Sequence, residues 1–287
     1  MDLSAIVIAL QEGENLRLTV DQLLSTFPAS SEIIVVDDGS TDGCADFLRV
    51  PGAPARLLAG KGSGVAGSRN LGASHSTGEV LLFVDAHMTL PRGWWNPLVD
   101  LLNGKASAAA PGVRDVTQTH RKGFGLRISG PELTSEWLAR PGDSPCAVPV
   151  LPGCSLAIRR EVFQSVGGFE AGMIRSQGID HEFCLRLWLL GHECWIAPEI
   201  EVVHLFREQL PYEISWETVL HNRLRLAMQH LDGRRIARVV EALRAKGGFP
   251  GAMALLADTD VLARRAEWRA RRVHDADWFF ERFGPEW

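Results

Sequence analysis

The chain has 287 residues, enough for one large domain or for one domain with an appendage. Hydrophobic residues make up 46% of the chain and charged residues 23%, proportions that let a globular protein bury a core without disulfide or metal staples. The formal net charge of −5 argues against broad nucleic-acid binding as the main task, so no nucleic-acid partner is expected.

The cysteines and the first residues bear on the compartment of the protein. The five cysteines are an odd number, are scattered and contain no Cys-x-x-Cys pair, which favours reduced thiols over a disulfide framework. The first apolar run, residues 5–10, is too short for the core of a signal peptide or for a membrane span. We therefore expect a cytoplasmic protein with no transmembrane segment.

Short apolar runs alternate with a helical pattern in the first third of the chain. Residues 5–10, 33–36 and 80–84 are continuous apolar runs, as expected of strands that are covered on both faces. Apolar positions spaced for one helix face follow the first run: Leu16, Val20, Leu23, Leu24 and Phe27. Strand, helix and strand at these spacings predict βαβ units, and therefore an α/β fold with a parallel sheet.

The middle of the chain is harder to interpret. Residues 103–146 are rich in glycine, proline and polar residues and predict no clear element. Beyond them, residues 180–190 predict a helix that Gly191 ends. Short strands are predicted on both sides of this helix at residues 155–158, 195–196 and 202–206.

From Trp216 onwards the pattern is wholly helical, so we divide the chain into an α/β domain, residues 1–213, and a helical C-terminal extension, residues 214–287. The basic excess of residues 234–272 indicates a solvated helix face, or docking on an anionic acceptor, an acidic peptide or a membrane surface. The aromatic residues at the C-terminus predict packing against the body of the protein or, as the alternative, a subunit contact in a homodimer.

Acidic residues follow three of the predicted strands. Glu12 comes after the first, Asp37 and Asp38 after the second, and Asp85 ends the third. Because ligands of open parallel sheets bind beyond the carboxyl ends of the strands, these acids are expected to meet at one edge, around a cation or hydrogen-bond donors. On local sequence alone, residues 37–40 are equally typical of a turn that enters a helix.

Asp85 and His87 form the most specific local motif. Residues i and i+2 of an extended segment point the same way, so a carboxylate oxygen and an imidazole nitrogen could bind one divalent ion. Mixed Asp and His ligation suits Mn²⁺ or a similar cation better than Ca²⁺. His204, at the end of another apolar run, is the candidate third ligand, although a histidine there, taken alone, is more often a satisfied structural residue.

These segments resemble those of a known family. Residues 7–12, 36–40 and 83–87 are similar to the signature segments of the GT-A glycosyltransferases in the family 2-like superfamily. The Asp-x-His motif is similar to that of the catalytic domain of the polypeptide N-acetylgalactosaminyltransferases. The likeness resumes at residues 168–173 and 203–207 and spans roughly residues 3 to 230. It implies a Rossmann-like, mostly parallel central sheet flanked by helices.

The resemblance also implies roles for individual residues. It implies nucleotide-sugar binding by Ala9, Glu12, Asp38, Arg69, Asp85, Gly153, Arg207 and Tyr212. It implies Mn²⁺ (or Mg²⁺) ligation by Asp85, His87 and His204. Within the first set, Asp38 would contact the donor base, Arg207 would bind the diphosphate, and Tyr212 would lie on a loop that closes over the donor. Gly153 would lie beside the donor sugar, where a Cβ would intrude.

The sequence departs from the family at residues 176–180. The N-acetylgalactosaminyltransferases have Trp-Gly-Gly-Glu-Asn there, whereas this chain has Ser-Gln-Gly-Ile-Asp. Asp180 instead fits the Glu-Asp pair of inverting GT-A enzymes, in which the aspartate is the general base. An aspartate at this position could also be the N-cap of the helix. Glu182 is the second catalytic candidate, through a hydrogen bond to acceptor or donor sugar, unless it only pairs with an arginine.

We therefore expect a metal-dependent glycosyltransferase that moves a sugar from a nucleotide-diphosphate donor, a UDP-sugar rather than a GDP-sugar, to a hydroxyl of a peptide or a small molecule. A nucleotidyltransferase is the second enzyme class, but residues 11–14 lack its glycine- and lysine-rich signature. A non-catalytic nucleotide-sugar-binding protein on a degenerate GT-A scaffold would predict broken metal ligands. The acceptor, the donor sugar, the stereochemical outcome and the oligomeric state stay open.

Overall fold

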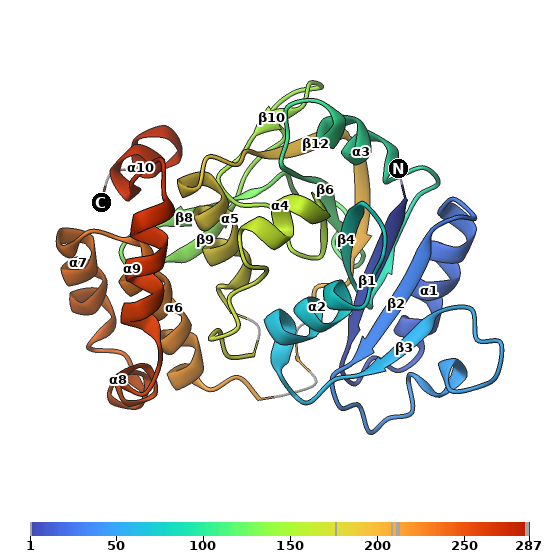
Figure 1. Cartoon of the computed structure of the whole chain (residues 1–287), viewed down its shortest axis with the longest axis horizontal. Helices are drawn as coiled ribbons and strands as arrows, with labels where there is room; N and C mark the ends of the chain where they lie inside the picture. Colours follow the sequence, from blue (N-terminus) through green and yellow to red (C-terminus); the bar gives the residue numbers. More distant parts are fainter. Residues whose placement is uncertain (1, 176, 208, 211–212, 285–286) are drawn as a thin grey trace.

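The structure is a computed structural model that describes residues 2–175, 177–207, 209–210, 213–284 and 287. Within this part of the chain, one ten-stranded sheet forms the centre of the molecule (Figure 1). Its strands are β1 (Leu3–Ala9), β2 (Glu32–Asp37), β3 (Arg56–Ala59), β4 (Val80–Asp85), β5 (Met88–Thr89), β6 (Ala108–Asp115), β7 (Lys122–Gly123), β10 (Cys146–Ala147), β11 (Ser155–Arg159) and β12 (Cys194–His204). The strands β8 (Leu126–Ser129) and β9 (Thr134–Trp137) form a separate hairpin.

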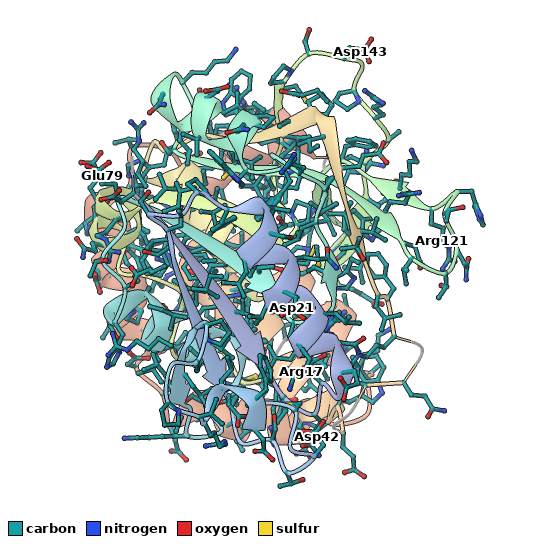
Figure 2. All side chains as sticks on the ribbon, turned by 90° about the vertical axis from the view of Figure 1, so that its right-hand side faces the viewer. Arg17, Asp21, Asp42, Glu79, Arg121 and Asp143 are labelled. Atoms are coloured by element: carbon teal, nitrogen blue, oxygen red, sulfur yellow. The ribbon has the colours of Figure 1, made fainter. Side chains whose placement is uncertain are left out.

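Helices cover both faces of the sheet and continue beyond it. They are α1 (Glu14–Thr26), α2 (Gly64–Ser74), α3 (Asn96–Asn103), α4 (Arg160–Ser165), α5 (Ile179–Leu189), α6 (Trp216–His230), α7 (Gly233–Leu243), α8 (Phe249–Ala257), α9 (Val261–Arg271) and α10 (Ala276–Phe283), with one 3-10 turn, η1 (Asp46–Leu48). In Figure 2, the charged side chains of Arg17 and Asp21 project from the outer face of α1, whose other face is buried.

The order of the strands confirms the predicted parallel sheet. The main path is β10-β12-β6-β11-β4-β1-β2-β3, in which β4, β1, β2 and β3 are parallel and β11 is antiparallel to both of its neighbours. The register places Ile8 opposite Asp85 and Ala9 opposite Asp37. Consequently the carboxyl ends of β1, β2 and β4 lie side by side at one edge of the sheet.

Alternation along the central strands explains the two hydrophobic cores. Ile6 and Phe83 point to the face that α2 and α5 cover, whereas Val7 and Val84 point to the face that α1 and α3 cover. All four side chains are almost fully buried. A strand buried on both faces must be continuously apolar, which is the pattern seen in the sequence.

One sequence prediction is wrong in this part of the fold. Residues 195–196 and 202–204 do not form two strands but belong to the single strand β12, which ends at His204, and residues 205–206 lie beyond it. The strand pairs in parallel with β6, and its register shifts between Ala197 and Glu201. This irregularity interrupts the apolar pattern, so the sequence of one irregular strand predicted two short strands.

The C-terminal part is helical, as predicted, and the five helices α6–α10 gather at the left in Figure 1, away from α1 and β3. They share a hydrophobic core with α5 and with the sheet. Gly191 follows α5 with a φ of 83°, the left-handed conformation expected after a helix. The boundary at residue 213 stays a prediction.

All five cysteines are free thiols, which agrees with the interpretation of the cysteine pattern. No helix in the described part of the chain has both the length and the apolar character that a membrane crossing requires. The cytoplasmic location stays a prediction.

Candidate metal and nucleotide-sugar site

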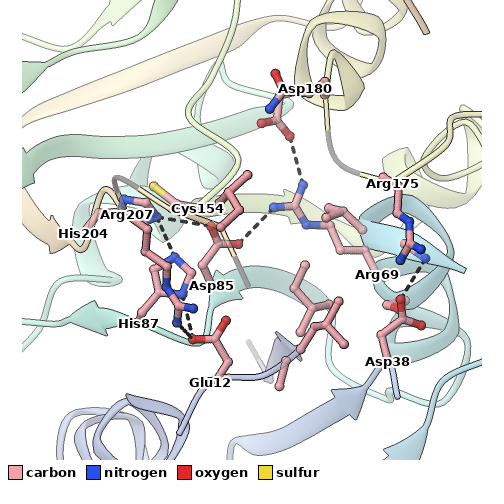
Figure 3. Close-up of a pocket in the computed structure, with 18 residues that line it drawn as sticks. Glu12, Asp38, Arg69, Asp85, His87, Cys154, Arg175, Asp180, His204 and Arg207 are labelled. Atoms are coloured by element: carbon pink, nitrogen blue, oxygen red, sulfur yellow. Dashed lines mark hydrogen bonds and ion pairs between the residues drawn. The ribbon is translucent and has the colours of Figure 1, made fainter. Parts of the chain in front are cut away.

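A pocket opens beyond the carboxyl ends of β1, β2 and β4, with a volume of about 270 Å³ (Figure 3). Its lining contains most of the residues that the sequence singled out: Ala9, Glu12, Asp38, Arg69, Asp85, His87, Asp180, His204 and Arg207. The predicted convergence on one sheet edge is therefore correct for Glu12, Asp38 and Asp85. Asp37 lies outside this lining, because its carboxylate accepts from the Ser40 amide at 2.8 Å and from Arg49 at 3.0 Å.

The possible metal ligands Asp85, His87 and His204 form a cluster in which one ligand atom from each lies within 4.8 Å of the others. Asp85 ends β4, and His87 follows two residues later. His204 comes from far along the chain, and the antiparallel pairing of β5 with β12 sets it opposite Met88. The Nε2 atoms of the two histidines are 3.1 Å apart, and the Nε2 atom of His204 is 3.4 Å from Oδ2 of Asp85. Two imidazoles and a carboxylate facing one point fit a borderline divalent cation such as Mn²⁺.

Glu12 supports this cluster rather than only lining the pocket. Its Oε2 atom is 3.1 Å from Nδ1 of His87 and also contacts the guanidinium of Arg207. Gln11, with a φ of 56°, makes the turn that brings Glu12 inward. A carboxylate on one nitrogen of an imidazole fixes its tautomer and leaves the other nitrogen to bind metal. Glu12 therefore orients His87.

Opposing effects set the protonation of the cluster. Burial would raise the pKa of Asp85, but the hydrogen bond with His204 and the positive charges of Arg69 and His87 hold that pKa well below its usual value. Burial would lower the pKa of His87, but the hydrogen bond with Glu12 and the negative charge of Asp85 raise it. The carboxylate of Asp85 is therefore ready to bind a cation, and binding of a metal ion to His87 competes with the proton that its raised pKa favours.

Arg69, from α2, joins the two acids of the pocket. It is 3% exposed and donates to Oδ1 of Asp180 at 2.9 Å, to Oδ1 of Asp85 at 3.3 Å and to the carbonyl of Gly153 at 2.7 Å. Burial would lower the pKa of the guanidinium, but the two carboxylates raise it. Arg69 therefore acts as a fixed positive charge that binds both acids, and in Figure 3 Asp180 lies above its guanidinium and Asp85 to its left.

Asp180 lies inside α5 rather than at its N-cap. The helix begins at Ile179, and its N-cap is Gly178, with a φ of 79°. The N-cap alternative for Asp180 is therefore wrong, and its side chain, 33% exposed, faces the pocket. A Cβ on Gly153 would lie 2.1 Å from Oδ1 of Asp180. The glycine thus makes room for the aspartate, although Gly153 itself is not among the lining residues.

Asp38 anchors the start of α2. Its two carboxylate oxygens accept from the backbone amides of Ser63 at 3.0 Å and Gly64 at 2.8 Å. Ala9 ends β1 on the same side of the pocket. Asp38 and Arg175 lie next to each other in Figure 3, across Arg69 from the metal cluster.

Glu182 does not reach the pocket. Its side chain is fully buried under α6, and both carboxylate oxygens accept from Arg186, at 2.7 and 2.9 Å. His230 approaches the same carboxylate at 2.8 Å. The structure therefore gives Glu182 the arginine-pairing role that the sequence left as an alternative, at a place where no substrate could touch it. Tyr212 lies outside the described residues.

Several lining residues were missed by the sequence analysis, including Arg175, Gln177, Ser68 and Cys154. Ser68 lies in the middle of α2, one residue before Arg69, and nothing in the local sequence marks it as a pocket residue. Outside the lining, Phe206 packs against His204 with ring centroids 4.4 Å apart and contacts Trp137 at 5.9 Å. Both aromatic side chains are more than one third exposed, which leaves an apolar surface beside the metal cluster.

Comparison with known proteins identifies the family. Residues 4–167, more than half of the chain, match the family described as Glycosyl transferase family 2, and the chain belongs to this family. Among curated proteins, it is similar to Polypeptide N-acetylgalactosaminyltransferase 15 of Homo sapiens, with 30% identity over 232 residues that cover 73% of this chain and 36% of that protein. It is also similar to Putative polypeptide N-acetylgalactosaminyltransferase 13 of Drosophila melanogaster, with 28% identity over 322 residues that cover 99% of this chain and 56% of that protein. The chain thus spans between 36% and 56% of the length of these two relatives.

Solved structures agree on the fold. GalNAc-T7 with UDP, GalNAc and Mn²⁺ aligns with a TM-score of 0.79 and 19% identity, over 98% of this chain and 56% of that chain. The mannosyltransferase PcManGT from Pyrobaculum calidifontis with GDP-Man and Mn²⁺ aligns with a TM-score of 0.54 and 19% identity, over 93% and 74% of the two chains. These matches confirm the predicted GT-A fold.

Proposed function

We propose that the protein is a metal-dependent glycosyltransferase that transfers a sugar from a nucleotide-diphosphate donor, a UDP-sugar, to a hydroxyl acceptor. The observation that carries this proposal is the cluster of Asp85, His87 and His204 at the edge of the pocket, with Glu12 behind His87. Relatives named as N-acetylgalactosaminyltransferases, and a matching structure that contains UDP and Mn²⁺, support the same chemistry.

The residues of the pocket would have separate roles in such a transfer. When bound, a divalent ion such as Mn²⁺ supplies positive charge to the leaving diphosphate. Asp85, His87 and His204 would hold that ion, and Arg207 lies beside them with its guanidinium on Glu12. A fixed arginine next to the developing phosphate charge stabilises the transition state without covalent chemistry. A bound diphosphate would compete with Glu12 for Arg207.

Asp180 is the proposed general base. Its carboxylate is partly exposed in the pocket, and Arg69 and Gly153 fix its position. A base on the side of the donor sugar opposite the diphosphate would take the acceptor proton and give inversion at the anomeric carbon. Proton NMR of the first product formed would report the anomeric configuration, and retention of configuration would rule out this role.

The acceptor is proposed to enter beside Phe206 and Trp137. These exposed rings lie next to His204, so an acceptor that carries an apolar group near its hydroxyl would contact them as it approached the metal cluster. A peptide with serine or threonine and a small molecule both satisfy this description.

Thermal unfolding with UDP-, GDP- and dTDP-sugars, with and without Mn²⁺, tests the donor site. One nucleotide should raise the melting temperature only when Mn²⁺ is present, because a ligand that binds the folded state stabilises it by mass action. His204→Ala should remove this rise, whereas the control His120→Ala, at an exposed turn, should keep it. No rise with any nucleotide would contradict the proposal.

Donor hydrolysis separates the enzyme from the alternative of a binding protein on a degenerate scaffold. An enzyme should hydrolyse the preferred donor slowly without acceptor, and Mn²⁺ should stimulate this reaction. Asp85→Ala should abolish the hydrolysis while the far-UV circular dichroism spectrum stays unchanged. Binding without any hydrolysis or transfer would favour the binding protein.

A further inference from the structure

Asn222, in the helix α6 of the C-terminal extension, is 1% exposed and makes three hydrogen bonds to backbone atoms near the pocket. Its Oδ1 atom accepts from the amide of Ile174 at 2.8 Å. Its Nδ2 atom donates to the carbonyl of Ile174 at 2.8 Å and to the carbonyl of Gln177 at 2.7 Å. One buried amide thus holds the backbone on both sides of Arg175.

Arg175 itself has an unfavourable backbone conformation. Its φ of 61° lies in the left-handed region, which residues other than glycine, asparagine and aspartate rarely adopt. Its carbonyl accepts from the amide of Val65 at 2.9 Å, in the first turn of α2. A Cβ on Gly64 would lie 2.7 Å from the same carbonyl oxygen, so the two segments are in close contact. A strained conformation persists only where its surroundings fix it, and here the amide of Val65 binds Arg175 while Asn222 binds the residues around it.

Both Arg175 and Gln177 line the donor pocket. Arg175 lies beside Asp38 in Figure 3, on the side of Arg69 away from the metal cluster. An arginine at this end of the pocket is suited to the base of a nucleotide, because its guanidinium carries several hydrogen-bond donors and stacks on aromatic rings. The position of this guanidinium depends on the local backbone, since the side chain starts from the strained residue.

We propose that Asn222 is a positioning residue for donor binding, and that it acts by holding Arg175 beside Asp38, at the end of the pocket away from the metal cluster, as a further binding residue for the nucleoside part of UDP. The proposal rests on the glycosyltransferase function proposed above. It makes α6 a structural part of the donor site, although this helix supplies none of the residues that line the pocket.

Titration calorimetry with UDP and Mn²⁺ tests the proposal on four variants of the full chain. Asn222→Ala should weaken UDP binding about tenfold or more, since small displacements of binding groups have large effects. Arg175→Ala should weaken it by at least as much. If Asn222 acts through Arg175, the double variant should bind UDP no more weakly than Arg175→Ala alone.

Gln229→Ala is the matched control. Gln229 is also a fully buried amide on α6, two turns after Asn222, and neither of its amide atoms has a hydrogen-bond partner within the described residues. Its replacement should leave UDP affinity unchanged. Equal losses of affinity in Gln229→Ala and Asn222→Ala would show a general effect of disturbing α6 and would overturn the proposal.

Two other outcomes would also overturn it. Asn222→Ala could bind UDP as tightly as the unaltered protein, or the double variant could lose the product of the two single effects. If Asn222→Ala fails to fold, Asn222→Ser replaces it, because a serine hydroxyl keeps a small uncharged polar group at this buried position but cannot make all three hydrogen bonds. Asn222→Ser should then weaken UDP binding, and unchanged binding would refute the positioning role.

Amide hydrogen exchange in the nucleotide-free protein gives a second readout. The amide of Ile174 should exchange faster in Asn222→Ala than in the unaltered chain. Equal rates would show that Asn222 does not hold this segment of backbone. If the unaltered protein binds no UDP with Mn²⁺, the proposed donor function fails, whatever the exchange rates are. If the unaltered protein binds UDP with Mn²⁺ but Asn222→Ala has the same UDP affinity and the same exchange rate at Ile174, the inference about Asn222 fails and the proposed donor function stands.

Discussion

Replacing Glu182 with glutamine should destabilise the folded protein by about 3 to 5 kcal/mol, the usual cost of breaking a buried ion pair. The carboxylate has no exposure and accepts two hydrogen bonds from Arg186. Burial would raise the pKa of Glu182, but Arg186 and His230 outweigh burial and lower the pKa from 4.5 to about 2. At about 1.4 kcal/mol for each pKa unit, this difference corresponds to about 3 kcal/mol at neutral pH.

The sign of this effect gives a pH dependence. Because the pKa of Glu182 is lower in the folded protein than in the unfolded chain, its contribution is present above pH 4.5 and is lost as the pH falls from 4.5 towards 2. The unaltered protein should therefore lose more stability over this range than Glu182→Gln does. The difference in the free energy of unfolding between the two proteins should shrink as the pH falls.

Urea unfolding followed by tryptophan fluorescence measures these free energies, since the chain has nine tryptophans. Glu136→Gln is the matched control, because Glu136 also forms a two-oxygen pair, with Arg127, but at the surface. Its loss should cost less than about 1 kcal/mol. If Glu182→Gln unfolds with the same free energy as the unaltered protein while its transfer rate falls, Glu182 is catalytic and the structural argument is wrong.

Three further predictions concern the site and its support. Gly153→Ala should lower kcat about 100-fold, because a Cβ would displace the carboxylate of Asp180, and steady-state kinetics with unchanged kcat would contradict this. Removal of divalent ions with EDTA should lower the melting temperature measured with UDP, and Mn²⁺ should restore it; equal melting curves would argue against the metal site. Arg225→Met should lower the free energy of urea unfolding by about 3 kcal/mol, because it takes a partner from the buried carboxylate of Glu170, and a loss below about 1 kcal/mol would refute this.

The metal cluster shows what a local pattern can and cannot predict. Asp85 and His87 could be proposed together because residues i and i+2 of an extended segment share a side. His204 could be proposed only as a candidate at the end of another apolar run, which the resemblance to a family then supported, since nothing in the sequence around it shows that β12 pairs with β5. Arg69 shows the same limit, because it binds Asp180 across 111 positions in the sequence.

Strand β6 could not be predicted, although it lies in the middle of the sheet. Its residues include three alanines, a proline and a glycine, and none of these gives a strand signal. The reason for the small residues lies in the packing: a Cβ on Gly112 would come within 2.4 Å of the ring of Phe124. A residue that must be small because a distant part of the chain packs against it gives no local indication of its own secondary structure.

The buried acids of the α/β part have a consequence for the order of events during synthesis. The cationic partners of Glu170 are Arg225 and Arg264, and His230 completes the partners of Glu182. All three of these partner side chains lie in the last quarter of the chain and leave the ribosome after both acids. Chains fold from the N-terminus as they emerge from the ribosome. The carboxylates of Glu170 and Glu182 therefore lack some of their partners until the C-terminal helices have been synthesised. Release of the C-terminal helices is then the step that completes the fold.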